Sequence, residues 1–261
     1  MTTLERWLSY DAVSASYDRG RPGYPAQLIE KCVEHTALNM ESRILEIGCG
    51  SGQATRPFAR LGFNMNCLEP GPNLATLARL NLYPFPRVTV RKEKFEDWKL
   101  EPEAFDLVLA ATSIHHVDNA VRYIKSAQAL KPGGHIAILG NHPGADEPQF
   151  RTELDRIYAR RWGEETSRVF AKQTLENRIG ATTRQIDDSG QFGPVTVLQH
   201  PWSEEYDIRH YMALLDSDSG RLNHPPETQE WLKRDITDAI IRLGGTVRRG
   251  YVAVMALAKR R

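Results

Sequence analysis

Three alternating glycines directly follow a short apolar segment, and this spacing could bind a nucleotide. Gly48, Gly50 and Gly52 come after residues 43–47, where Glu46 interrupts the apolar side chains. Alternating glycines let the backbone turn tightly and let a ligand approach without meeting a Cβ atom. The helix expected after them would point its free N–H groups into the same space. Together these elements predict a nucleotide-sized cleft.

The glycine spacing and two acidic residues indicate which nucleotide would fit. The dinucleotide fingerprint G-x-G-x-x-G would need a glycine at position 53, where this chain has Gln53. Glu46 precedes the first glycine closely, and a carboxylate is a poor neighbour for a diphosphate but a good one for a cation. Glu69 ends the next apolar segment, where a carboxylate can accept hydrogen bonds from both ribose hydroxyls. These residues predict a positively charged adenosine ligand without phosphates, and S-adenosylmethionine fits that description.

Strand and helix patterns alternate along the first half of the chain and predict how these residues are positioned. Strands are expected at 43–47, 63–68, 87–91, 105–110 and 135–140. This alternation predicts a parallel sheet with helices on both faces. Ligands of such sheets bind outside the carboxyl ends of the strands, so the residues just after each strand are the candidates for function.

The alternation stops after Gly140, where helical patterns predominate. Residues 143–191 predict an inserted helical cap, and residues 194–198 and 251–258 predict two more strands. We therefore expect one α/β domain over 1–261: a Rossmann-like, doubly wound, mostly parallel seven-stranded sheet with a helical cap after strand five. Its parts are expected as an N-terminal arm or flap (1–30), a cofactor-binding core (31–142), the cap (143–191), and C-terminal strands with a lid helix and a last helix (192–261).

The segment 17–25, YDRGRPGYP, admits two interpretations. Its two prolines and two glycines argue against a long helix or a strand. It could be a docked arm, or a flap that brings Tyr17 and Arg21 to the cleft.

The motif at 44–52, ILEIGCGSG, resembles motif I of the class I S-adenosylmethionine-dependent methyltransferases. The segments FDLVLAATSIHHVD and LKPGG are similar to the family's fourth-strand and fifth-strand regions, and the likeness covers roughly residues 43–140. The element RPGYP at 21–25 resembles the small-molecule branch that includes trans-aconitate-type, methyltransferase type 11-like enzymes. The resemblance favours the flap over the docked arm.

The resemblance also implies roles for individual residues. It implies that Glu46 orients the ammonium group of S-adenosylmethionine, that Glu69 holds the ribose, and that Arg21 pairs with the cofactor carboxylate. The cofactor-binding residues implied in this way are Tyr17, Arg21, Glu46, Gly48, Cys49, Gly50, Gly52, Glu69, Pro70, Phe95, Glu96 and Ala111. The product would be S-adenosylhomocysteine.

Methyl transfer needs aligned reactants and the exclusion of water, and it needs a general base only for a hydroxyl or a protonated amine. His115 and His116 follow the fourth strand, and one could be that base, or both could only shape the wall. Tyr17 is a further candidate as a hydrogen-bond partner, and His142 is a weaker candidate base. Five aromatic residues could form an apolar acceptor pocket or the core under a cap: Trp162, Phe170, Trp202, Tyr206 and Tyr211.

Composition limits the partners and the compartment. The formal net charge of +1 gives no overall field that would attract nucleic acid. The three cysteines form no C-x-x-C motif, which argues against a disulfide framework or a metal site. No apolar run is long enough to span a membrane, and the N-terminal residues are too charged for a signal peptide. We expect a cytoplasmic protein whose partner is a small-molecule methyl acceptor, with neither a membrane nor nucleic acid.

Three alternatives stay open. The first is an RNA or protein methyltransferase, for which the cluster Arg156, Arg160 and Arg161 could supply a basic surface. The second is a protein that binds the cofactor without turnover, since binding and catalysis are separable. The third, a nicotinamide-dependent oxidoreductase, is disfavoured by the glycine spacing.

Overall fold

The computed structural model describes residues 6–163, 174–218 and 224–261, and in them seven strands form one sheet. The strands are β1 (Arg43–Ile47), β2 (Asn64–Leu68), β3 (Val88–Arg91), β4 (Phe105–Ala111), β5 (Leu130–Pro143), β6 (Thr196–Asp207) and β7 (Thr246–Lys259). Their order is β3-β2-β1-β4-β5-β7-β6. Strands β1 to β5 are parallel, and β7 is antiparallel to both of its neighbours. The predicted doubly wound, mostly parallel seven-stranded sheet is confirmed.

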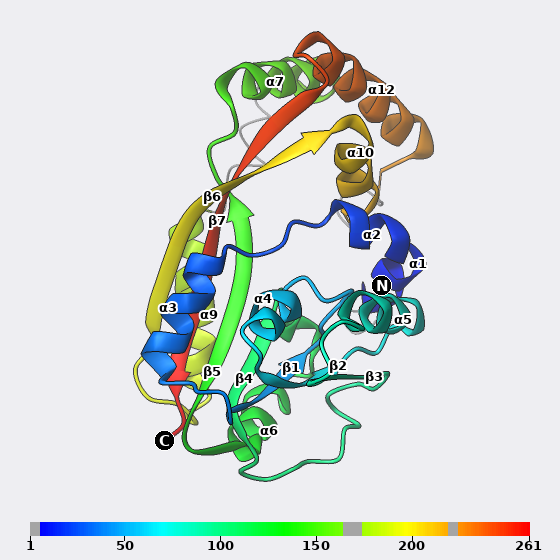
Figure 1. Cartoon of the computed structure of the whole chain (residues 1–261). Coiled ribbons are helices and arrows are strands. Elements are labelled where there is room, and N and C mark those ends of the chain that lie inside the picture. Colours follow the sequence, from blue (N-terminus) through cyan, green and yellow to red (C-terminus); the bar gives the residue numbers. More distant parts are fainter. Residues whose placement is uncertain (1–5, 164–173, 219–223) are drawn as a thin grey trace.

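Helices cover both faces of this sheet (Figure 1). The helices of the first half are α1 (Arg6–Ala12), α2 (Ser14–Gly20), α3 (Ala26–Thr36), α4 (Thr55–Arg60), α5 (Pro72–Leu82) and α6 (Arg122–Ala129), with a 3-10 turn at Ile114–His116. Those of the second half are α7 (Pro148–Trp162), α9 (Leu175–Asp188), α10 (Ile208–Asp216) and α12 (Pro226–Arg242). No helix in the described part of the chain has the length and apolar character that crossing a bilayer requires.

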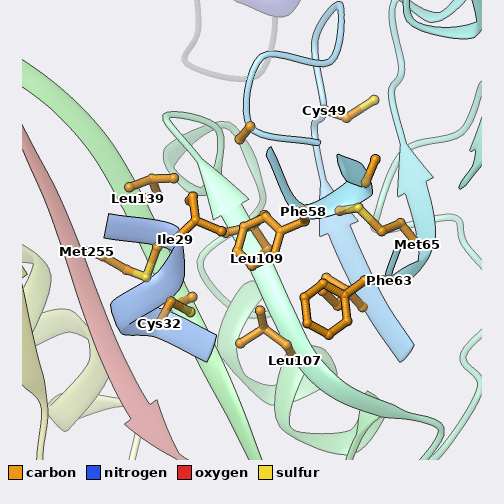
Figure 2. Close-up of a cluster of buried hydrophobic side chains, with 14 of the residues drawn as sticks. Ile29, Cys32, Cys49, Phe58, Phe63, Met65, Leu107, Leu109, Leu139 and Met255 are labelled. Carbon is orange, nitrogen blue, oxygen red and sulfur yellow. The ribbon is translucent and has the colours of Figure 1, made fainter. Parts of the chain in front are cut away.

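Alternate side chains of the central strands build two separate cores. In β4, Leu107 and Leu109 pack with Ile29 of α3 and Phe58 of α4, as Figure 2 shows. Val108 lies between them in the strand and packs on the opposite face with residues of α6. Burying one such side chain stabilises the fold by about 1.5–3 kcal/mol. Because both faces are covered, the strand is apolar at almost every position.

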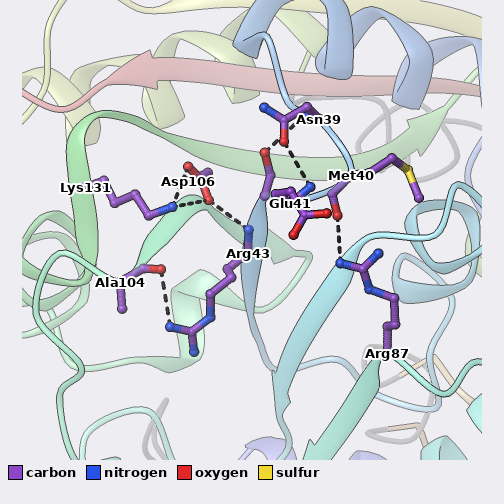
Figure 3. A network of polar contacts seen from close by, with 9 residues as sticks. Asn39, Met40, Glu41, Arg43, Arg87, Ala104, Asp106 and Lys131 are labelled. Carbon is purple, nitrogen blue, oxygen red and sulfur yellow. Dashed lines mark hydrogen bonds and ion pairs between the residues drawn. The ribbon is translucent and has the colours of Figure 1, made fainter.

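A polar network joins the amino ends of the strands, at the edge opposite to the glycine turn (Figure 3). Asp106 Oδ2 accepts hydrogen bonds from the Arg43 backbone N–H and from Lys131 Nζ, each at 2.8 Å. Arg87 donates to the Met40 carbonyl at 2.7 Å. These contacts join the starts of β1, β4 and β5, and they join the segment before β3 to the loop before β1.

The helical cap that we expected from residues 143–191 is built only in part from that segment. Helix α7 gathers with α10 and α12 around a third core at one end of the molecule, which we call the lobe (Figure 1). Helix α9 lies within 143–191 but covers the sheet, where Ile186 packs with Phe192 and Ala256. The lobe is therefore assembled from three separate stretches of chain on the outer ends of β6 and β7.

The N-terminal arm is more helical than we expected. Helix α2 includes Tyr17 and ends at Gly20, and only residues 21–25 are extended before α3 begins. The proline and glycine content limited the length of the helix but did not prevent its formation.

Candidate functional site

A cavity of about 250 Å³ opens at the carboxyl ends of β1, β2 and β4. Ten of the predicted site residues line it: Tyr17, Arg21, Gly48, Gly50, Glu69, Pro70, Phe95, Glu96, Ala111 and His116. Four predicted residues do not line it: Glu46, Cys49, Gly52 and His115. Its position is the one expected for a ligand of a doubly wound sheet.

The glycine turn closes one side of the cavity with backbone that a side chain would obstruct. Gly48 and Gly50 have φ values of +67° and +59°, a region that L side chains rarely adopt. A Cβ atom on Gly50 would lie 3.2 Å from the Tyr17 ring. Gly52 also has a positive φ, but its missing side chain faces Leu82 in the core. Cys49 is buried in the same core, so these two positions shape the turn from behind.

Glu69 lies between the turn and α5. One carboxylate oxygen accepts the Gly50 N–H and the other accepts the Gly71 N–H, both at 2.9 Å. Burial raises the pKa of Glu69 to about 7 against these two hydrogen bonds. Each oxygen keeps a lone pair, which suits a ligand that donates two hydroxyls.

Glu46 lies beneath the turn and does not contribute to the cavity wall. Its Oε2 accepts a hydrogen bond from Thr55 at 2.7 Å, while Oε1 is buried without a hydrogen-bond partner in the described structure. Burial raises the pKa of Glu46 to about 7. A nearby positive charge would favour its ionised form, so the carboxylate fits a cationic ligand above it.

The segment around Phe95 and Glu96 forms the far wall and is tied to α6. Lys125 Nζ donates to the backbone carbonyls of both residues at 2.8 Å. The Glu96 carboxylate accepts the Asp118 N–H at 2.9 Å. Lys125 and Asp118 were not predicted as site residues, because no local sequence pattern links residues more than 20 positions apart.

The end of β4 carries a strained residue. Thr112 has a φ of +55°, which is rare for a β-branched side chain. Its hydroxyl lies 3.1 Å from the hydroxyl of Tyr24, and burial raises the pKa of Tyr24 to about 12. Strain of this kind concentrates at functional sites.

The three candidate histidines lie in different surroundings. His116 lines the cavity, and its ring centroid is 5.8 Å from that of Tyr10. His115 is exposed beside it, with ring centroids 4.0 Å apart. His142 lies near Arg178 of α9, and burial lowers its pKa. Only His116 is placed to contact a ligand of this cavity.

The arm covers the cavity with aromatic rings and a cation. The Arg21 guanidinium lies 5.5 Å from the Tyr17 ring centroid and 5.9 Å from that of Tyr10, and it donates to the Ser217 carbonyl at 2.5 Å. Burial raises the pKa of Tyr17, so its hydroxyl stays protonated. Tyr10 was missed by sequence analysis, although it stands one heptad before Tyr17.

A second cavity of about 320 Å³ lies on the other side of the arm. Arg21 lines both cavities, and Tyr24 connects them through its contact with Thr112. Residues of α3 and α4, Arg56 among them, complete its wall together with Gln53, which precedes α4.

The aromatic residues proposed for an acceptor pocket lie elsewhere. Tyr206 and Tyr211 are buried in the core of the lobe, and Trp162 packs against it. Trp202 donates to the Asn141 side chain at 3.0 Å. Phe170 lies outside the described residues. Among the described residues there is also no cluster of His, Cys, Asp and Glu that could hold a metal ion.

The sequence matches a known family model over residues 45–138, described as Methyltransferase domain. An uncharacterized methyltransferase of Mycobacterium bovis is 29% identical over 51% of this chain and 52% of its own length. A ubiquinone biosynthesis O-methyltransferase of Xanthomonas campestris is 34% identical over 40% of this chain and 46% of its own length. The chain thus spans about half the length of the curated relatives it matches.

A solved methyltransferase structure from Anaeromyxobacter dehalogenans shares the fold. It has a TM-score of 0.62 and 23% identity, and the match covers 92% of this chain and 96% of that one. The match to the methyltransferase-domain model over residues 45–138 and this shared fold agree with the expected class I S-adenosylmethionine-dependent methyltransferase domain. The trans-aconitate-type branch stays a prediction.

Proposed function

Because residues 45–138 belong to the methyltransferase-domain family, we propose that this protein transfers a methyl group from S-adenosylmethionine to a small molecule. One observation carries the proposal. The cavity combines a glycine turn with positive φ values, a carboxylate held open by two backbone amides, and a covering arm with Arg21. These groups match a ribose, a cationic centre and a carboxylate.

The residues present suit the cofactor along the length of the cavity. Glu69 would accept the ribose hydroxyls, and the wall formed by Phe95 and Glu96 would lie against the adenine. Gly48 and Gly50 would admit the methionine part, and Arg21 would pair with its carboxylate. Glu46 and Glu69 would both gain from the positive charge of the ligand, since burial disfavours their ionised forms.

The chain's own part in the chemistry is to align the reactants and to keep water out. Bound S-adenosylmethionine supplies a methyl carbon activated by a positively charged sulfur. The arm excludes water through Tyr10 and Tyr17. His116 could take a proton from a hydroxyl or ammonium acceptor where that acceptor extends into this first cavity. A carboxylate acceptor would need no base.

We place the acceptor in the second cavity. It adjoins the first through Arg21 and through the Tyr24–Thr112 contact, so an acceptor there would lie beside the methionine end of the cofactor. An O-methyltransferase among the relatives supports a small-molecule acceptor. This location differs from the aromatic acceptor pocket, which was one of the two interpretations that the sequence left open.

A calorimetric titration followed by a methyl-transfer screen tests the proposal. The protein should bind S-adenosylmethionine and S-adenosylhomocysteine but not NAD, and it should label at least one member of a panel of small acids, phenols and amines. Labelling of tRNA or protein alone would favour the alternative methyltransferase classes. Binding without transfer to any acceptor would favour a protein without turnover.

A further inference from the structure

The arm carries one buried carboxylate that the roles above do not use. Asp11 is the penultimate residue of α1, and only 6% of it is exposed. Its Oδ1 accepts the backbone N–H groups of Asn73 and Leu74, each at 2.9 Å. Its Oδ2 accepts the Asn73 side-chain amide at 3.0 Å. A single side chain thus joins the arm to a helix some sixty residues away in sequence.

These bonds cap α5 from outside. The first N–H groups of a helix lack partners within it, and the helix dipole attracts a negative charge there. The residue at the N-cap position of α5 is Gly71, which has no side chain to do this. Asp11 supplies the missing cap, so the stability of the helix start depends on the arm being in place.

The capped helix begins next to the cofactor cavity. Gly71 follows Glu69 and Pro70, which line the cavity, and its N–H is one of the two that hold the Glu69 carboxylate. On the arm, Tyr10 lines the cavity and precedes Asp11 directly. The Asp11 contact therefore fixes the covering rings relative to the ribose-binding carboxylate.

Gly71 is fitted to this contact. A Cβ atom there would lie 2.5 Å from Asp11 Oδ1 and 3.0 Å from its Cγ. Its own φ of −71° and ψ of 120° suit any residue. A side chain at position 71 would therefore collide with Asp11, but it would not strain the backbone.

We propose that Asp11 is a positioning residue for the cofactor: it clasps the arm to the start of α5 and so keeps the cavity covered. The identity of the ligand rests on the proposed function, whereas the clasp itself does not. If only molecules with a closed arm bind the ligand, the apparent affinity falls in proportion to the fraction of molecules whose arm is closed.

Three variants test the clasp by calorimetry with S-adenosylhomocysteine. Asp11→Ala removes the cap, and Gly71→Ala displaces Asp11 without straining the backbone. Each should weaken binding by about tenfold, which corresponds to a closed fraction of about one tenth. The double variant should bind no more weakly than either single variant, because both remove the same contact.

Thr174→Ala is the matched control, since Thr174 caps α9 through Asn177 on another part of the molecule. It should lower the melting temperature to a similar extent and leave the binding constant unchanged. Amide exchange of the ligand-free protein should rise over residues 6–20 and 72–75 in the Asp11 and Gly71 variants only. Binding of Asp11→Ala within twofold of wild type, or additive effects in the double variant, would overturn the proposal.

Amide exchange separates this failure from a failure of the proposed function. If the wild-type protein binds no S-adenosylhomocysteine, the proposed function is wrong, and the exchange data alone decide the clasp. Unchanged exchange over the arm in Asp11→Ala would then reject it.

Discussion

Two carboxyl groups, Glu46 and Glu69, lie buried on either side of the glycine turn. Burial raises the pKa of each to about 7, and the hydrogen bonds that each accepts offset this only partly. The nearby carboxylate of Glu69 also raises the pKa of Glu46. A cation above the turn would relieve both costs, so binding of the cofactor and loss of protons are linked.

This linkage predicts opposite pH trends for stability and binding. The folded pKa of about 7 lies above the model-peptide value of 4.5 in both residues. Their contribution to the stability of the ligand-free protein is therefore complete below the lower value and is lost as the pH rises through the higher one. A cationic ligand favours the ionised forms, so S-adenosylmethionine should bind more tightly as the pH approaches 7 and level off above it.

Calorimetry between pH 5.5 and 8.5 measures this dependence, which should reach about tenfold in affinity per pH unit for each coupled proton. Glu46→Gln should reduce the slope without abolishing it. An affinity that is independent of pH in wild type would contradict the linkage.

Gly48 offers a second test at the level of one residue. Its φ of +67° is matched by Gly190 at +68°, but a Cβ atom on Gly48 would lie 2.7 Å from that of Ser113, whereas one on Gly190 would meet nothing within 4 Å. Gly190→Ala should cost about 1–2 kcal/mol of unfolding free energy, from backbone strain alone. Gly48→Ala should cost more, by about 1–3 kcal/mol for overpacking, and should also lose cofactor binding.

Urea unfolding of both variants, with a titration of S-adenosylhomocysteine, makes the comparison. Equal losses of stability and unchanged binding in the two variants would show that the turn is not crowded as described.

At the scale of elements, α2 and α10 touch through Gly20. A Cβ atom there would lie 2.2 Å from the Leu214 backbone nitrogen and 2.3 Å from the Ala213 carbonyl carbon. Backbone atoms cannot rotate away, so the helices would have to separate. The usual gain of about 0.5–1 kcal/mol for replacing a helical glycine by alanine should therefore be reversed at this position.

Gly180 of α9 is the matched control, because its nearest neighbour is the flexible Arg184 side chain at 3.3 Å. Gly180→Ala should raise the melting temperature slightly, and Gly20→Ala should lower it and weaken cofactor binding. If the two substitutions shift the melting temperature in the same direction, the close approach of α2 and α10 is wrong.

The sheet could be predicted from the sequence because its pattern is local. Residues 43–47 are apolar at nearly every position and end in a glycine turn, and the observed β1 has the same bounds. Strands β6 and β7 were predicted too short, since their outer halves alternate with exposed charged residues such as Glu205 and Arg248. Those halves are held by pairing with each other, which no single segment reveals.

The candidate site, like the sheet, was predictable where its signals are local in the sequence. Spacing and resemblance located the glycine turn, Glu69 and the arm residues Tyr17 and Arg21. Asp11 and Lys125 were missed, because each acts on the backbone of a distant segment. Glu46 was found, but its position beneath the turn, where Thr55 donates a hydrogen bond to it, has no signal in the local sequence.

At the scale of the whole molecule, the contacts within the lobe decide whether the basic cluster of α7 is available to a partner. Arg156 lies 2.8 Å from Glu153 of its own helix, and Arg160 lies 3.0 Å from Asp235 of α12. Arg161 donates to the Thr228 hydroxyl at 3.0 Å. The contacts of Arg160 and Arg161 join α7 to α12, and the acidic partners of Arg156 and Arg160 compensate two of the three positive charges.

We therefore expect weak, nonspecific nucleic-acid binding. A protein that neutralises several phosphates loses affinity steeply with salt, by about 10³–10⁵-fold between 50 and 200 mM for 6–10 contacts. With a net charge of +1 and its lobe arginines paired, this protein should show no measurable affinity for tRNA at 150 mM salt and only a shallow salt slope below it. Filter binding over a salt series measures both quantities.

Arg156→Gln together with Arg160→Gln should lower the melting temperature and leave methyl transfer to a small acceptor intact, because the lobe's ion pairs lie away from both cavities. Tight tRNA binding that this double substitution abolishes would instead assign the cluster to an RNA substrate.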